Sequence, residues 1–254
     1  MKAITDSPFA VFVISLLVLW ASTKVGMMGN RKAAIDADAR KDFSVVLTAT
    51  LTLLALIIGF SFSMAVNRYD QRKNLEEAEA NAIETEYLRA DLLTTEAAAK
   101  VRALLKSYLG QRIQFHSISD GPSLAAINVR TAALQAELWV AVTDAGSVQP
   151  TPLTAIAVSG MNDVLNSQGY TQAARWNRIP PAVWILMGVI ASCGTALVGY
   201  GARNDKTGKS LLMVLPFVVS MSFFLIAEID SPMGGIIRVA PENLQSLAAS
   251  LRAP

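Results

Sequence analysis

Residues 44–66 read SVVLTATLTLLALIIGFSFSMAV and contain no charged side chain. A helix needs about 20 mainly apolar residues to cross the roughly 30 Å hydrocarbon core of a bilayer. This segment has the length and the composition of such a helix. It therefore predicts a membrane-spanning element, and the rest of the chain can be read outward from it.

The composition of the whole chain also favours a membrane protein. The 254 residues are 52% hydrophobic and only 17% charged, whereas soluble domains carry about 25% charged residues. The formal net charge is +2, so we expect no nucleic-acid partner. One cysteine and one histidine cannot form a His/Cys metal site within one chain, and we expect neither a metal nor a cofactor.

Three other apolar stretches complete a prediction of four transmembrane helices. In chain order they cover about residues 8–28, 181–202 and 210–227. Pro216 lies inside the last stretch, so we expect a kink there. The first stretch follows Lys2 and could be a cleaved signal peptide, but no A-x-A pattern follows it, so we expect a retained span.

Small residues recur at helical spacing on the third predicted span. Two rows carry them four positions apart: Gly188, Ser192 and Ala196, and Ala191, Thr195 and Gly199. Small side chains let helix backbones approach closely within a bilayer. We therefore expect the third span to be a close-packing surface.

The polar region between the second and third spans is too long for a simple loop. Its helix formers and periodic leucines predict helices at about residues 72–93, 95–118, 123–144 and 153–168. No proline occurs between Met64 and Leu93, so the second span is expected to continue as one long helix. Strand-like alternation is absent.

The predicted architecture is an all-α polytopic membrane protein. Its parts are residues 1–66 (spans 1 and 2 with a short basic loop), 67–180 (a helical extramembrane region), 181–228 (spans 3 and 4) and 229–254 (a C-terminal tail). Lysine and arginine are nearly balanced on the two sides, so the positive-inside rule gives no orientation. Four spans place both termini and the helical region on one side.

Motifs that suggest an enzyme lack essential parts. Residues 207–210, TGKS, end like a phosphate-binding loop, but Arg203 stands where the pattern needs glycine. His116 has no second histidine and no nucleophile motif beside it. Cys193 lies in an apolar span, where it is expected to pack as a small hydrophobic residue. We therefore predict that the chain is not an enzyme.

Acidic side chains are concentrated just after the second span. They include Glu76, Glu79, Glu84 and Glu86, and they lack the alternating oxygen ligands of a calcium loop. They form either a solvated helical face or, in several copies of the chain, a ring of charge along an ion path. Glu228 and Asp230, at the end of the fourth span, have the same alternatives.

Three sequence stretches resemble a known family. Residues 59–70, GFSFSMAVNRYD, resemble the corresponding span of bestrophins, with its Gly-Phe pair and Arg-aromatic ending. Residues 79–93, EANAIETEYLRADLL, and residues 228–242, EIDSPMGGIIRVAPE, are similar to the bacterial bestrophin-like DUF4239 family. With the four-span layout, the resemblance covers nearly the whole chain.

The resemblance implies a pentameric ion channel in which the helical region forms a vestibule that continues the pore. The Gly-Phe match implies a hydrophobic neck at Thr52, Leu56 and Phe60, although Thr52 departs from the usual bulky apolar residue. Steps of four place these side chains on roughly one helical face, and Ser44 and Thr48 extend the line. Ordinary helix packing explains the same stripe.

We therefore expect an oligomeric channel of the bacterial inner membrane that conducts small inorganic ions. The candidate ion-pathway charges are Glu76, Glu79, Glu84, Glu86, Glu228 and Asp230. The helical region and both termini are cytoplasmic by resemblance, and calcium gating is not expected. The alternative is a non-conducting membrane scaffold or sensor whose helical region binds a partner. A secondary transporter fits less well, because no span interior contains an ionisable group.

Overall fold

A computed structural model describes residues 7–30, 37–118, 121–202, 211–232 and 234–252. Over these residues the chain forms helices and no strand, which confirms the all-α prediction. The chain divides into two compact units. Unit 1 contains residues 1–68 and 178–238, and unit 2 contains residues 69–177 and 239–254. The TGKS stretch lies outside the described residues.

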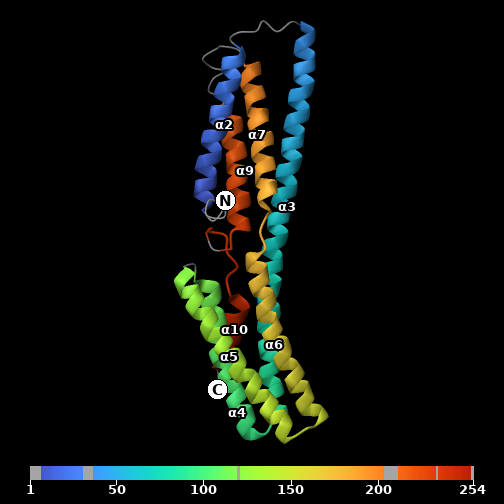
Figure 1. The fold of residues 1–254 in the computed structure, drawn as a ribbon, viewed down its shortest axis with the longest axis vertical. Coiled ribbons are helices and arrows are strands. Elements are labelled where there is room, and N and C mark those ends of the chain that lie inside the picture. The colour runs from blue at the N-terminus through green and yellow to red at the C-terminus, as the bar shows by residue number, and fades with distance from the viewer. Residues whose placement is uncertain (1–6, 31–36, 119–120, 203–210, 233, 253–254) are drawn as a thin grey trace. The chain divides into compact units, whose positions relative to one another are not determined.

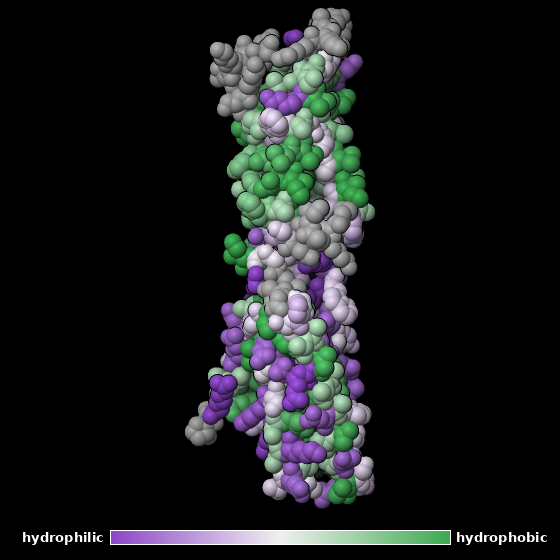
Figure 2. Space-filling view, turned by 60° about the vertical axis from the view of Figure 1, so that its left-hand side comes forward, coloured by the Kyte–Doolittle hydropathy of each residue, from purple (hydrophilic) through white to green (hydrophobic). Residues whose placement is uncertain are grey.

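Unit 1 holds the apolar helices. They are α2 (Pro8–Asn30), the first part of α3 (Ala37–Arg89), α7 (Pro181–Gly201) and α9 (Val214–Asp230) (Figure 1). Hydrophobic residues cover the face of this unit that the space-filling view shows, and hydrophilic residues recur over unit 2 (Figure 2). The chain is therefore a membrane protein built on an apolar helical unit.

Three of the four predicted spans are confirmed by length and composition. Helices within Pro8–Gly29, Arg40–Leu92 and Pro152–Gly201 are long and apolar enough to cross a bilayer. Helix α9, at the fourth predicted span, has only 17 residues. At 1.5 Å per residue it is about 26 Å long, which is short of a roughly 30 Å hydrocarbon core.

The kink expected at Pro216 is wrong. Helix α9 begins at Val214, so Pro216 occupies the third helical position. The first four N–H groups of a helix have no intrahelical acceptor, and a proline there removes no hydrogen bond. Pro216 therefore lies at the start of α9 and does not interrupt it.

The close packing predicted for the third span occurs between α7 and α2. Thr23 on α2 and Ala191, Thr195 and Gly199 on α7 are buried. A Cβ atom at Gly199 would overlap the backbone carbonyl of Thr23, and one at Gly26 would overlap that of Ala196. The two backbones therefore pack in direct contact, which only glycine permits at these two positions.

Unit 2 is a helical bundle around its own apolar core. It contains the second part of α3, the 3-10 turn η1 (Ala90–Leu92), α4 (Thr95–Ser117), α5 (Gly121–Val148), α6 (Pro152–Trp176) and α10 (Glu242–Ser250). The core includes Ile83, Leu105, Leu138, Met161 and Leu244. The observed helices confirm those predicted between residues 72 and 168, and α3 confirms the single long helix.

Helix α10 lies in the segment predicted as a C-terminal tail. It has nine residues, too few for a clear periodic pattern. Its Leu244 and Leu247 are buried in the core of unit 2. The C-terminal segment therefore completes the bundle.

Candidate functional site

The predicted neck residues lie on the face of α3 that points away from the other helices of unit 1. Leu54 is only 3% exposed and marks the packed face of α3. Leu56 is 51% exposed and Phe60 is 63% exposed. Successive residues turn by about 100° around a helix, so Leu56 lies about 200° from Leu54. The described part of the chain therefore leaves these apolar side chains uncovered.

The line from Ser44 to Phe60 drifts around the helix. Each step of four residues adds about 40°, so the three neck positions occupy a sector of about 80°. Thr52, Thr48 and Ser44 are exposed, and the Ser44 hydroxyl donates to the Lys41 carbonyl at 2.8 Å. The structure thus brings Thr52, Leu56 and Phe60 to one face and turns Ser44 and Thr48 progressively away.

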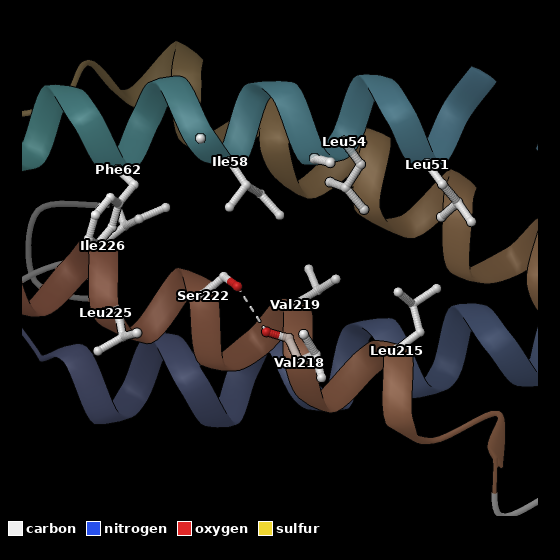
Figure 3. Close-up of a pocket in the computed structure, with 12 residues that line it drawn as sticks. Leu51, Leu54, Ile58, Phe62, Leu215, Val218, Val219, Ser222, Leu225 and Ile226 are labelled. Atoms are coloured by element: carbon white, nitrogen blue, oxygen red, sulfur yellow. Dashed lines mark hydrogen bonds between the residues drawn. The ribbon is translucent and has the colours of Figure 1, made fainter. Parts of the chain in front are cut away.

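A separate apolar groove lies on the flank of α3 that faces α9. Side chains from the two helices point toward one another across it (Figure 3), and its volume is about 480 Å³. Its only hydroxyl, on Ser222, donates to the Val218 carbonyl at 3.0 Å. The groove is therefore mostly apolar. None of the three neck residues lines it, and its lining includes Leu51, Leu54, Ile58, Phe62, Leu215 and Ile226.

Glu76 caps the N-terminus of α10. One carboxylate oxygen accepts the backbone N–H of Leu244 at 3.0 Å, and the other accepts the Asn243 amide at 2.7 Å. Leu244 is the third residue of α10, where the N–H group has no intrahelical acceptor. The buried carboxylate thus joins α3 to the C-terminal helix.

Glu79 forms the polar centre of unit 2. Its carboxylate accepts two hydrogen bonds from the fully buried guanidinium of Arg112 and one from the Thr171 hydroxyl at 3.0 Å. The His116 imidazole lies 3.9 Å away. Burial alone would raise the pKa of Glu79, but His116 and Arg112 outweigh burial and hold this pKa below its ordinary value. Glu79 therefore remains ionised and connects α3 to α4 and α6.

Two arginines contact the ring of Phe115. The guanidinium carbons of Arg112 and Arg175 lie 4.2 and 4.4 Å from the ring centroid. Arg175 also donates to the carbonyls of Phe115 at 2.7 Å and Ile118 at 3.0 Å. Burial and the charge of Arg112 lower the pKa of Arg175 to about 10. The pair fixes the end of α4 against α6.

The other candidate charges differ in exposure. Glu84 is exposed and Glu86 is buried. In unit 1, Glu228 accepts the N–H of Ile236 at 2.6 Å. Asp230 accepts the N–H of Ile179 with both oxygens, at 3.1 and 3.2 Å. Of the six predicted charges, Glu84 alone lies on the surface of the single chain.

Sequence reasoning missed the partners of these carboxylates. Arg112 follows Val101, Leu105 and Tyr108 on the buried stripe of α4. A cation at an apolar position of this kind needs a buried anion, so the stripe alone predicts that Arg112 has a buried acidic partner. The identity of the anion, 33 residues earlier in the chain, depends on the tertiary fold.

Acidic, histidine and cysteine side chains do not gather into a metal-binding group in the described part of the chain. Across those ranges, no group of three or more His, Cys, Asp or Glu side chains is placed to hold a metal ion. Cys193 is exposed on α7. The arrangement offers an apolar helix face, an apolar groove and buried charges engaged in the fold.

Comparisons with known proteins give a family and a fold. The sequence matches the family model described as Bestrophin-like domain over residues 9–244. No curated protein matches it.

Several solved structures share its fold. A variant of a bacterial Bestrophin homolog from Klebsiella pneumoniae has a TM-score of 0.70 at 11% identity, covering 94% of this chain and 97% of that one. A Bestrophin homolog from the same organism, solved by Zn-SAD phasing, has a TM-score of 0.65 at 13% identity, covering 94% and 95%. A structure described as a membrane protein has a TM-score of 0.68 at 10% identity, covering 94% and 97%.

Proposed function

Because this chain belongs to the Bestrophin-like domain family, we propose that it is one subunit of an oligomeric channel for small inorganic ions. The bacterial inner membrane is the proposed location, and a homopentamer is the proposed assembly. The observation that carries the proposal is the uncovered apolar face of α3 at Leu56 and Phe60. Copies of this face around a common axis would form a narrow hydrophobic neck.

A hydrophobic neck controls ion conduction because ions pass only when water fills the neck. A ring of apolar side chains can empty of water, and a small movement of the helix then rewets it. Phe60 and Leu56 supply the apolar rings in this proposal, and the Thr52 hydroxyl makes its own level wetter. Ser44 and Thr48 continue the path beyond the neck, on a face that turns gradually away from the axis.

The contacts within unit 2 support four spans. Residues 239–254 pack with residues 69–177, and Glu76 binds Asn243 and Leu244. Both ends of residues 178–238 therefore return to the same side of the membrane. Such a segment crosses an even number of times, so α7 needs α9 as a second crossing. Its 17 residues are at the lower limit for a spanning helix.

Unit 2 is the proposed vestibule, cytoplasmic together with both termini. Glu84 is exposed and can meet passing ions directly. Glu76, Glu79, Glu228 and Asp230 are buried in the single chain, so their charges would act on ions only through the local field. Glu86 is buried as well. The flux experiment below distinguishes anion conduction from cation conduction.

Ion flux through purified protein in sealed liposomes tests the neck. We expect the double variant Leu56→Ala/Phe60→Ala to conduct several-fold faster than the wild type, because smaller side chains leave a wider and wetter constriction. Comparing chloride with sodium and potassium gives the selectivity.

Phe62→Ala is the matched control. Phe62 is two residues further along α3 and lines the groove toward α9, so its truncation should leave flux near the wild-type rate. Equal flux through the wild type and the double variant would count against the neck. No flux from a folded oligomer would contradict the channel itself.

One observation favours the alternative of a membrane scaffold or sensor. Helix α5 exposes Val129, Val140 and Val148 on the surface of unit 2. An apolar face on an extramembrane bundle needs a cover, either another subunit or a different protein. A folded monomer without flux would select the scaffold.

A further inference from the structure

Glu86 is a buried carboxyl group without a hydrogen-bond partner. Its residue is 0% exposed, and within the described residues neither carboxyl oxygen has a donor in reach. It lies 20 residues beyond the end of the uncharged segment 44–66, about 30 Å further along α3. It is therefore a feature of unit 2, outside the proposed spans.

Helix α6 closes directly over this carboxyl group. A Cβ atom at Gly160 would overlap Oε2 of Glu86 and Nη1 of Arg89. The neighbouring Met161 and Ala157 are fully buried. The contact leaves no room for a hydration shell around Glu86 while α3 and α6 remain packed.

The charged groups that act on Glu86 lie on α3 and α6, and α4 places further charges beside the adjacent Tyr87. Arg89 lies one turn further on α3, and the exposed Asp163 lies on α6; both act on Glu86 electrostatically. On α4, Arg102 is paired with Asp91 at 2.6 Å and, with Lys106, lies over the ring of Tyr87. None of these groups donates a hydrogen bond to Glu86 within the described residues.

An ionised carboxylate in this position is costly. Burial without a compensating hydrogen bond disfavours the charged form. Burial is the largest cause that raises the pKa of Glu86, to about 8; Arg89 lowers this pKa and Asp163 raises it further. The neutral acid is therefore the form that fits the packed bundle.

We propose that Glu86 is a proton-binding site that makes the contact between α3 and α6 sensitive to pH. With the proton bound, the neutral carboxyl packs against Gly160. When the proton leaves, the carboxylate needs water or a hydrogen bond from Arg89, whose Nη1 already lies beside the same point of Gly160, so the packing of α6 against α3 must rearrange. This inference concerns unit 2 alone and does not depend on ion conduction.

Thermal unfolding of the purified full-length protein between pH 5 and pH 9 tests the site. The unfolded Glu86 ionises near pH 4.5, whereas the folded one keeps its proton to about pH 8. Unfolding therefore releases a proton in this window, and stability falls as pH rises. One proton corresponds to a tenfold fall in the folded-to-unfolded ratio per pH unit. We expect Glu86→Gln to lose this component of the pH dependence.

A variant of the exposed neighbour Asp163 tests the site even if Glu86→Gln fails to fold. Asp163→Asn removes a negative charge near Glu86, so the pH at which stability stops falling should shift downward. Glu77→Gln is the control, because Glu77 is an exposed acid on the same helix and should leave the profile unchanged. Identical pH profiles for the wild type, Glu86→Gln and Asp163→Asn would overturn the proposal.

Infrared spectroscopy observes the proton directly. At pH 7 the wild type should show the carbonyl band of a protonated carboxylic acid that titrates away near pH 8, and Glu86→Gln should lack it. If the wild type shows no such band at pH 7, Glu86 is ionised and the proposal is wrong. Neither measurement requires flux, so this result and the channel proposal can fail separately.

Discussion

Glu79 and Glu86 are both buried on the same helix, yet their environments have opposite effects. Glu79 accepts hydrogen bonds from Arg112 and Thr171, and its pKa is lowered. Glu86 has no donor among the residues that the structure describes, and its pKa is raised. The opposite pKa shifts follow from the hydrogen-bond partners of the two carboxyl groups and not from their burial, because a buried charge is tolerated only when it is paired.

Removing the partner of Glu79 should be costly. We expect Arg112→Met to lower the free energy of unfolding by about 3–5 kcal/mol, because it leaves a buried carboxylate unpaired. Denaturant titration in detergent, followed by tryptophan fluorescence, measures the loss. The double variant Arg112→Met/Glu79→Leu should recover much of it.

The exposed ion pair between Arg102 and Asp91 is the matched comparison. These side chains are 30% and 69% exposed, and such pairs contribute about 0–1 kcal/mol. Equal losses from Arg102→Met and Arg112→Met would contradict the assignment of Glu79 as the polar centre of unit 2.

At the scale of helices, the sequence predicted which helices form better than it predicted where each helix begins and ends. Helix α3 follows from an uncharged segment continued by helix formers without proline, and α4, α5 and α6 follow from periodic leucines. Helix α10 was missed because nine residues carry little periodic signal. The kink at Pro216 was predicted wrongly because α9 begins at Val214, after the start of the apolar stretch at about residue 210. Apolar composition does not mark where a helix begins.

Contact between α2 and α7 depends on glycine at a single position of α7. We expect Gly199→Ala to lower the melting temperature by several degrees, because the added methyl group overlaps the Thr23 carbonyl. Overpacking of this kind costs about 1–3 kcal/mol. A thermal-shift assay in detergent measures the change.

Gly188→Ala on the same helix is the control. Nothing lies within 4 Å of a Cβ atom at Gly188, so the substitution should be neutral or slightly stabilising through helix propensity. A larger loss at Gly188 than at Gly199 would show that α2 and α7 do not pack through Gly199.

For the whole molecule, spacing in the sequence placed the neck residues together but did not reveal which face of α3 is free. That depends on which side of α3 packs on α7, through Leu54 and Gly194. The groove toward α9 and the bond of Glu76 to Leu244 join residues more than 150 positions apart. Such pairs arise from the tertiary topology, which local periodicity and spacing in the sequence do not reveal.

Chain topology can be tested by labelling single cysteines. In a Cys193→Ser background, we expect Ser147→Cys and Ser250→Cys to react with a membrane-impermeant maleimide from the same side. Leu211→Cys, which lies between α7 and α9, should react from the opposite side. These three positions are exposed, so accessibility reports sidedness.

A different labelling pattern would exclude four spans. If Ser250→Cys and Leu211→Cys react from the same side, α9 does not cross the membrane. The contact of α10 with the rest of unit 2 would then be impossible in the bilayer.

The placement of α10 also has a consequence for biosynthesis. The ribosome completes residues 69–177 well before it reaches Leu244 and Leu247, which fill the core of unit 2. Until then Glu76 lacks its donors and the bundle keeps an open apolar site. Unit 2 therefore closes only after α7 and α9 have been synthesised. A nascent chain that stops before residue 239 lacks Leu244 and Leu247 and therefore leaves the core of unit 2 incomplete.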